Sequence, residues 1–422
     1  MAYPNDDYFS NMLNENVTME LLWTELTKRD WLMSNIEIDN SWLSDKFVVP
    51  FAASVPSSVR FKKLTPTSQI AKAKTGRGLV SEYKEAYGSM VFNHRELAYH
   101  GKITEQNFLK LLPQQIDKHM EFFKFVVSQN MLTGKAFTVG LSDGDASGNI
   151  LVADPERLQL NQAVEITSDV VTTPILGFVK TINPNTGNIR LVTTVDGTTG
   201  VNLTTIDLVD DPKIFVRGQN TDGFQSIVDA LLPAAAGGSA TLYGITKTDF
   251  PFTQAIVSDG GSGGLNITDS NILQKIFEFY ARFRKRGKGN PFNVLVDYNN
   301  FAHIVASLES SKKAFNVVPN SRKTSAYGYS EIEIAGFAGV LKLIAVQEMT
   351  QSEILFLDLT SMKFATNKGF MRLESPQGQQ YTIERTEDAI LYILDHVLYG
   401  ELIVHTPEKN AMIYGVNTTR LG

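Results

Sequence analysis

The stretch from Thr104 to Gly134 carries the longest uninterrupted helical pattern in the sequence. Its apolar side chains recur every three or four residues, so they form one stripe, made by Ile116, Met120, Phe123, Val127 and Met131. Thr104 can cap the start, Gly134 suits the left-handed position that closes a helix, and Pro113 should kink or restart it. At about 1.5 Å per residue the helix would be on the order of 40 Å long, which is more than a compact domain needs and is consistent with a spine. A long core helix of a globular enzyme is the alternative, because periodicity reports burial and not purpose.

Composition limits the classes of protein that this chain can belong to. Its 422 residues, 43% of them hydrophobic, predict two or three domains with cores of their own. The absence of cysteine excludes disulfides, a thiolate nucleophile and cysteine-ligated metals, and it fits a reducing place of synthesis. No apolar run approaches the roughly 20 residues of a membrane span, and the first residues lack the pattern of a signal peptide. The sequence therefore predicts a soluble protein without a membrane partner.

All three tryptophans, Trp23, Trp31 and Trp42, lie in the first tenth of the chain. Large aromatic side chains on an otherwise polar arm are often anchors on another surface. Residues 1–48 are therefore interpreted as an N-terminal arm that packs against a neighbour, with packing on its own domain as the alternative.

The next stretch, residues 47–81, has no acidic residue and six cations: Arg60, Lys62, Lys63, Lys72, Lys74 and Arg77. Strand-like alternation at Val59–Lys62 and a glycine-rich tip at Thr75–Gly78 predict a long two-stranded excursion. A basic hairpin without a core of its own needs a partner, either nucleic acid or acidic surface of a neighbouring subunit. A merely solvated loop is the remaining alternative.

From Phe137 to Asn220 the period becomes strand-like, and no helix is predicted. The clearest hairpin runs from Gly177 to Val192 around an Asn-Pro-Asn-Thr-Gly turn. This block holds ten acids and five bases, and hence most of the net charge of −6. It is predicted to be a small all-β barrel inserted into the chain, facing outward.

Residues 223–360 return to mixed α/β character. Asp269 is expected to cap a helix whose apolar stripe is Ile272, Ile276, Phe279 and Phe283, and whose basic end lies in solvent. Strands are predicted at 293–296 and 340–346, and long strands between Tyr381 and Val404.

Two motifs suggest chemistry, each with a simpler explanation. Gly260–Gly264 satisfies the G-x-S-x-G elbow, which would expose Ser262 as a nucleophile, with Asp358 and His396 following in hydrolase order. The elbow requires a helix directly after the serine, whereas the helix is predicted only from Asp269, so a flexible loop is favoured.

The segment from Asp143 to Asp154 resembles the start of a calcium loop, but Asp154 is short for the bidentate position, and a polar turn is favoured. The six histidines are scattered, and no phosphate-binding glycine loop is present. The sequence therefore predicts no catalytic, cofactor or metal site, and a protein that is not an enzyme.

The order of these elements resembles the major capsid proteins of tailed bacteriophages, the Hong Kong 97-type fold. Stretches similar to members of that family are Asp222–Asp229, Leu242–Ile245, Asn293–Asp297 and Gly400–Pro407. The resemblance covers nearly the whole chain but rests on order more than on a signature. It implies an α+β fold with an N-arm (1–48), an E-loop (49–98), the spine helix of the P-domain (99–136), an inserted β-barrel (137–221), an A-domain (222–362) and returning P-domain strands (363–422).

The resemblance also implies a function and partners. The chain would assemble as hexamers and pentamers into an icosahedral head in the host bacterial cytoplasm, enclosing phage DNA without reading its sequence. A separate scaffolding protein, a portal and possible decoration proteins are the implied partners. The tryptophans and the six cations named above are the expected contacts between subunits.

Three other functions remain open at this point. An encapsulin, the shell of a cellular compartment, has the same fold. A serine hydrolase would use Ser262. A nucleic-acid-binding protein would use the basic hairpin and bind with strong salt dependence.

Overall fold

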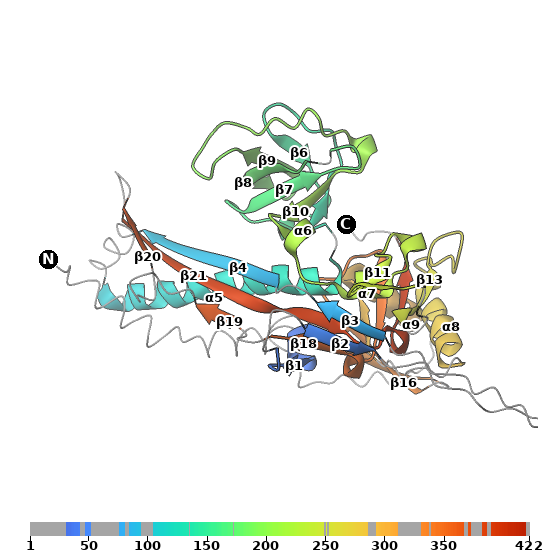
Figure 1. Ribbon diagram of the computed structural model, residues 1–422. Helices are drawn as coiled ribbons and strands as arrows, with labels where there is room; N and C mark the ends of the chain where they lie inside the picture. Colours follow the sequence, from blue (N-terminus) through green and yellow to red (C-terminus); the bar gives the residue numbers. More distant parts are fainter. Residues whose placement is uncertain are drawn as a thin grey trace, which may run out of the picture. The chain divides into compact units, whose positions relative to one another are not determined.

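The computed structural model describes residues 31–42, 47–51, 76–80, 84–93, 104–134, 136–171, 173–248, 250, 253–285, 293–310, 331–336, 339–366, 370–372, 382–385 and 390–418. The chain forms two compact units: unit 1 comprises Met1–Thr133 and Gln225–Gly422, and unit 2 comprises Gly134–Phe224. The chain thus leaves unit 1 once, builds unit 2, and returns (Figure 1).

The predicted long helix is α5, Thr104–Leu132, and it runs through Pro113 without restarting. Gly134 has φ +59° and closes it as expected. Met120, Phe123, Val127 and Met131 of the predicted stripe are buried. In its last turns α5 also buries polar side chains, Ser128, Gln129 and Asn130, so this end of the helix is enclosed on several faces. No described helix is both long enough and apolar enough to cross a membrane.

The longest strand of unit 1 is β21, Ile390–Val404. One edge pairs with β4, Lys84–Asn93, in an antiparallel register that runs from Leu391↔Asn93 to Gly400↔Lys84. The other edge of β21 pairs with β19 (Phe370–Arg372) and β20 (Thr382–Arg385). The last residues of β21, after the β4 pairing ends, pair with β18 (Met362–Ala365). The predicted long strands between Tyr381 and Val404 are confirmed. Figure 1 shows β4 and β21 running along α5.

Two short N-terminal elements join this part of unit 1. The helix α3, Trp31–Asn35, contacts α5, and β1, Glu37–Asp39, pairs in parallel with β18.

The basic excursion differs from its prediction. β2, Phe47–Phe51, pairs antiparallel with β3, Gly76–Val80, so Gly76–Gly78 is part of a strand, and the prediction that it is a flexible tip is wrong. Glycine can adopt the conformation of a turn or of a strand. Here pairing with the apolar strand β2 makes the segment a strand, with Val49 opposite Gly78 and Phe51 opposite Gly76. Val59–Lys62 lies outside the described residues.

The range 49–98, expected as the E-loop, contains strands of two different sheets. Its last described strand, β4, belongs to the sheet of β21 rather than to the β2–β3 pair. Ten paired residues along β21 outweigh sequence proximity to β3.

A mixed six-stranded sheet forms the second core of unit 1, in the order β13-β22-β17-β14-β16-β15. Its strands are β13 (Ile256–Asp259), β14 (Asn293–Val296), β15 (Glu331–Gly336), β16 (Gly339–Ala345), β17 (Glu353–Leu357) and β22 (Ala411–Tyr414). The predicted strands at 293–296 and 340–346 are confirmed within one residue. β22 lies in this sheet and not with β18 to β21, so the predicted range 363–422 spans two sheets.

Two helices, α8 (Ile272–Lys285) and α9 (Tyr298–Ser310), share one apolar core with this sheet. Phe279 and Tyr280 stack near Phe356 of β17, with ring centroids 5.2 and 6.4 Å apart. The expected cap is wrong, because the helix begins at Ile272 and the Asn271 side chain accepts from Thr268 N at its start.

Unit 2 is one antiparallel sheet in the order β5-β10-β7-β8-β9-β6. The strands are β5 (Thr138–Val139), β6 (Asn149–Leu151), β7 (Ala163–Thr167), β8 (Ile175–Asn183), β9 (Asn188–Val192) and β10 (Lys213–Val216), and the β8–β9 pair is the predicted hairpin. Leu141 N donates to Leu151 O and Ala153 N to Val139 O, so hydrogen bonds also join the two ends of this order. Val164, Ile166, Val179 and Ile189 fill its interior.

Candidate functional site

The glycine-rich segment around Ser262 is a closed turn after β13. Leu265 N donates to Asp259 O, Ile267 N donates to Gly260 O, and α8 begins only at Ile272. Asp358 is occupied in capping the 3-10 turn Leu359–Ser361, where its Oδ1 accepts from Thr360 N at 3.1 Å. Strand β13 precedes this turn, but no helix directly follows Ser262, so the strand–turn–helix arrangement of a nucleophile elbow is not formed there and the structure does not support the hydrolase hypothesis.

The calcium-like segment is a polar turn. Asp145 Oδ1 accepts from the backbone N–H groups of Ser147 (2.8 Å) and Asn149 (2.7 Å), and Asp143 Oδ1 accepts from Leu208 N (2.8 Å). Asp154 lies near Arg157 instead, at 3.9 Å. Backbone donors occupy the oxygens that a cation would need. Among the described residues no group of three His, Asp or Glu side chains is placed to hold a metal ion.

Two histidines that are far apart in the sequence meet between α5 and β21. His119 Nε2 and His396 Nε2 lie 3.3 Å apart, with the rings edge to face, and Phe123 packs on His396. Burial lowers the pKa of His119 to about 4, so this residue is neutral near pH 7. The pair fills the layer between helix and sheet, as the sequence predicted for structural histidines.

The tryptophans that the structure describes serve the chain's own fold. Trp31 in α3 and Trp42 are 7% and 1% exposed, and the Trp42 ring lies 5.2 Å from that of Phe47. The interpretation of these two as anchors on another subunit is therefore wrong, because burial inside unit 1 leaves no ring surface for a partner. Trp23 lies outside the described residues, as do Arg60, Lys62, Lys63, Lys72 and Lys74. Arg77 lies in β3, and its side chain is not described.

The sheet of β4 and β21 has one covered and one open face. Gly88 and Met90 of β4 are buried toward α5; a Cβ on Gly88 would meet Phe123 of α5 at 3.0 Å. Tyr87 and Val91, which point the other way, are 58% and 57% exposed. Side chains alternate across a strand, so the exposed side is continuous along β4. We call this exposed side of β4, marked by Tyr87 and Val91, the open face.

The β2–β3 pair also exposes apolar side chains. Val48 and Leu79 are cross-strand partners, and both are about half exposed. Leu79 N donates to Tyr243 O, which fixes this pair to the rest of unit 1. The sequence analysis did not identify Tyr87, Val91, Val48 or Leu79 as contact residues, although the period-two pattern of Tyr87, Ser89 and Val91 was a usable signal.

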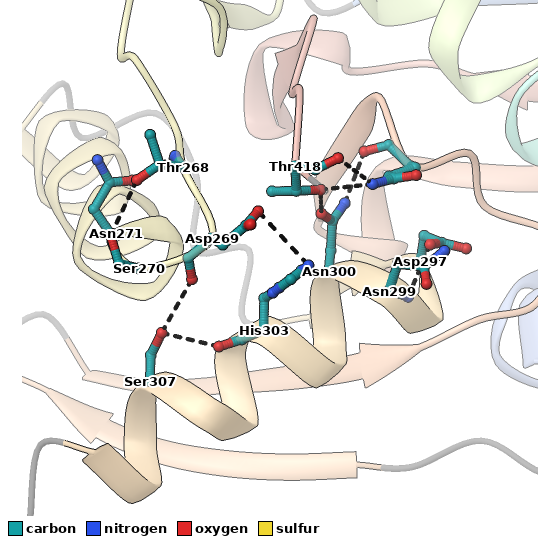
Figure 2. A network of polar contacts seen from close by, with 11 residues as sticks. Thr268, Asp269, Ser270, Asn271, Asp297, Asn299, Asn300, His303, Ser307 and Thr418 are labelled. Atoms are coloured by element: carbon teal, nitrogen blue, oxygen red, sulfur yellow. Dashed lines mark hydrogen bonds and ion pairs between the residues drawn. The ribbon is translucent and has the colours of Figure 1, made fainter. Parts of the chain in front are cut away.

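Polar contacts fix the C-terminal residues to α9 (Figure 2). Thr418 Oγ1 donates to Asn300 Oδ1 (2.7 Å), Asn300 Nδ2 to Gln351 O (2.7 Å) and Gln351 Nε2 to Thr418 O (2.6 Å). One turn further along α9, His303 Nε2 lies 3.6 Å from Asp269 Oδ1. Asn300 is fully buried, so this closed ring of hydrogen bonds stabilises the fold.

A second buried polar cluster lies around Glu401 of β21. Its Oε1 accepts from Gln225 N (2.6 Å) and Leu402 N (3.0 Å), and burial raises its pKa to about 7. Nearby, Lys247 Nζ donates to the carbonyl oxygens of Asp229 and Leu232, and burial lowers its pKa to about 8. Glu401 thus joins the segment just before α7 (Ile227–Leu231) to β21, and Lys247 binds carbonyl groups at the end of that helix; nothing in the local sequence pattern predicted these contacts.

An ion pair anchors β1. Lys363 Nζ of β18 donates to Asp39 Oδ2, and this hydrogen bond lowers the pKa of Asp39 to about 2. The same ammonium group lies 5.2 Å from the centre of the Phe47 ring. The pair thus links the N-terminal segment to the returning strands.

No protein family and no curated protein matches this chain. Among solved structures it is similar to the cyanophage A-1(L) capsid asymmetric unit, with 11% identity over 90% of both chains and a TM-score of 0.47. A chain of Gordonia phage Cozz has 10% identity, coverage of 93% and 87%, and a TM-score of 0.45. The SrpI encapsulin of Synechococcus elongatus has 10% identity, coverage of 94% and 92%, and a TM-score of 0.36. All three TM-scores are below 0.5, so we infer the function from the surfaces of the chain itself.

Proposed function

We propose that this chain is the major capsid protein of a tailed bacteriophage, a structural subunit that assembles as hexamers and pentamers into an icosahedral shell around double-stranded DNA. The observation that carries the proposal is the open face. A ten-residue antiparallel pair, β4 with β21, is covered by α5 on one side and carries exposed Tyr87 and Val91 on the other. Large apolar side chains exposed on a sheet are typical of a surface that another chain covers.

The β2–β3 pair supports the same function. One side of the pair is buried in unit 1 through Val49 and Val80, and the backbone hydrogen bond from Leu79 N to Tyr243 O also holds it there, whereas Val48 and Leu79 remain exposed. A two-stranded ribbon is marginally stable alone. Its exposed residues Val48 and Leu79 are therefore suited to lie on a second copy of the chain.

The parts of the subunit take the roles that the resemblance implies, with changed bounds: β4 is moved out of the expected E-loop range 49–98, and β22 out of the returning strands 363–422. We assign α5, β4 and β18 to β21 to the P-domain, the sheet of β13 to β17 and β22 with α8 and α9 to the A-domain, and β2–β3 with residues 52–75 to the E-loop. Residues 1–46, before β2, form the N-arm. Unit 2 is an inserted β-barrel, supported by the hydrogen bonds between β5 and β6.

The remaining partners follow from assembly. A separate scaffolding protein, a portal and decoration proteins would join the shell, which forms in the host bacterial cytoplasm and becomes part of the virion. DNA is enclosed without sequence-specific contacts, which fits the net charge of −6.

The open face provides the test. Tyr87→Glu with Val91→Glu places two charges where apolar surface must be buried, and burying an unpaired charge is unfavourable by several kcal/mol. We expect a folded subunit, by circular dichroism and thermal unfolding, whose particle yield in negative-stain micrographs and sizing falls by about tenfold or more.

Leu176→Glu with Val195→Glu is the matched control, because both residues are exposed apolar side chains in unit 2. The control should assemble as the original chain does. A chain that remains a monomer with its scaffold and in crowding salt would contradict the shell function itself. Nuclease-protected DNA inside the particles would distinguish a phage head from an encapsulin.

A further inference from the structure

Three loops of unit 2 meet, and two of them carry exposed apolar side chains. Asp169 N donates to Asp210 O, so the loop after β7 runs beside the 3-10 turn η2, Leu208–Asp210. Val170, Leu208 and Val209 on these loops are 68%, 46% and 88% exposed. Other residues fill the interior of unit 2, so these three side chains do not contribute to its core. We call them the apolar patch of unit 2.

The backbone under the patch is held in place. Asp207 accepts from Val209 N at 2.9 Å, and Asp143 Oδ1, from the third loop, accepts from Leu208 N at 2.8 Å. Asp211, the residue directly after η2, has φ +48° and ends this turn. A loop that is ordered before binding loses little conformational entropy when a partner docks, which is the usual advantage of preorganisation.

Carboxylates surround the patch. Five aspartates stand on its three loops, and a cation beside them, Lys213, already forms an ion pair with Asp211 at 3.0 Å. The five are Asp143, Asp169, Asp207, Asp210 and Asp211. A partner that covers this surface must carry positive charge between apolar side chains, because like charges across an interface are costly.

We propose that the apolar patch of unit 2 binds the basic segment, residues 52–75, of a second copy of this chain. Within that segment, Val59-Arg60-Phe61-Lys62-Lys63-Leu64 interleaves apolar and cationic side chains, and the whole stretch 47–81 has six cations and no acid. Its composition is thus complementary to the patch in both charge and hydrophobicity. The ends of the segment are fixed by β2 and β3, and a loop of this length fixed at both ends can extend up to roughly 40 Å from them. This inference rests on the proposed shell function, and it names the surface that receives the basic segment.

Charge reversal tests the contact. The variant Asp169→Lys with Asp210→Lys changes two aspartates whose side chains cap no turn, and the backbone hydrogen bond between these residues is retained. The variant Lys62→Glu with Lys63→Glu reverses the proposed partner. Each variant alone should keep the unfolding temperature of the subunit and reduce particle yield by about tenfold or more, because like charges then face each other at every repeat of the contact.

Mixing the two variants separates contact between copies from contact within one chain. In an equal mixture, the reversed patch of one variant meets the reversed segment of the other, so particle yield should return toward that of the original chain. If the contact were within one chain, only the quadruple variant would assemble and the mixture would not. Rescue confined to the quadruple variant, or no rescue at all, therefore overturns the proposal.

The control is Asp196→Lys compared with Asp210→Lys. Both reverse one exposed or half-exposed aspartate of unit 2, but Asp196 lies in the loop after β9, outside the three loops of the patch. Asp196→Lys should assemble normally. If Asp169→Lys with Asp210→Lys also assembles normally, the inference fails while the shell function stands. If the original chain forms no particles, the proposed function fails first.

Discussion

Tyr243 joins three segments of unit 1. Its hydroxyl donates to Leu402 O and accepts from Val404 N, both at 2.8 Å, while its carbonyl oxygen accepts from Leu79 N. It does so at φ +48°, an uncommon conformation for a bulky residue. A strained conformation persists only where surrounding contacts hold the residue in place. Here the hydrogen bonds to β3 and β21 hold Tyr243.

Glu401, next to these contacts, makes stability depend on pH. Its pKa is raised from 4.5 to about 7, so between these values the folded chain binds a proton that the unfolded chain releases. The stabilising effect of protonation is complete below about pH 4.5 and is lost as the pH rises through 7. Glu401→Gln keeps an oxygen for Gln225 N and Leu402 N but has no charge to bury. We expect Glu401→Gln to raise the free energy of unfolding of unit 1 at pH 8 by an amount on the order of 3 kcal/mol. The decline of this free energy between pH 5 and pH 8 should become smaller in the variant.

Urea unfolding at several pH values measures this effect, and Glu85→Gln is the control because Glu85 is an exposed carboxylate on the neighbouring strand β4. If the free energy of unfolding declined equally with pH in the Glu401→Gln variant and in the original chain, another group would be the one that titrates.

At the scale of elements, the packing of α5 on the β4–β21 pair depends on one glycine. A Cβ on Gly88 would lie 2.3 Å from His396 Nε2 and 3.0 Å from Phe123 Cδ2. The ring of His396 is itself held against His119, so it has little room to move. The absence of a side chain at position 88 thus sets how closely the helix approaches the sheet.

We therefore expect Gly88→Ala to destabilise unit 1 by about 1–3 kcal/mol, the usual range for overpacking. Gly263→Ala is the matched control, because a Cβ there would make only an ordinary contact, 3.5 Å from Asp259 Oδ2. Thermal or urea unfolding measures both. In a His396→Ala background the space is free, so the added effect of Gly88→Ala should largely disappear; additive effects of the two changes would contradict steric contact as the cause.

At the scale of the molecule, unit 2 enters and leaves through neighbouring strands. Val139 of β5 pairs with Lys213 of β10, and Gly140 N donates to Pro212 O. An insertion whose ends are adjacent and whose interior is its own does not need to contribute to the core of its host.

We expect that replacing residues 140–218 with a short Gly/Ser linker leaves unit 1 folded. Its free energy of unfolding should stay within the change expected from a surface substitution, about 0.5 kcal/mol. Urea unfolding, limited proteolysis and circular dichroism of the shortened chain check this. An extensive loss of α5 helicity, or rapid cleavage inside unit 1, would mean that unit 2 is part of the core architecture.

The sequence by itself determined the elements whose signals are local. The stripe of Met120, Phe123, Val127 and Met131 predicted α5, and the alternation around an Asn-Pro-Asn-Thr-Gly turn predicted the β8–β9 hairpin. Both signals report which side of an element is buried, and neighbouring residues alone determine that. The open face was within reach of the same reasoning, because Tyr87 and Val91 follow the period of a strand.

Only the tertiary structure decided which elements meet. Strand β4 pairs with β21 some three hundred residues away, Gly76–Val80 becomes a strand because β2 lies beside it, and Trp42 is buried in its own unit. The same holds for His119 beside His396, for Glu401 at Gln225 N, and for the two loops that carry Val170, Leu208 and Val209. The physical reason is that pairing and burial are chosen by competition among all distant partners at once, whereas periodicity records only that a partner exists.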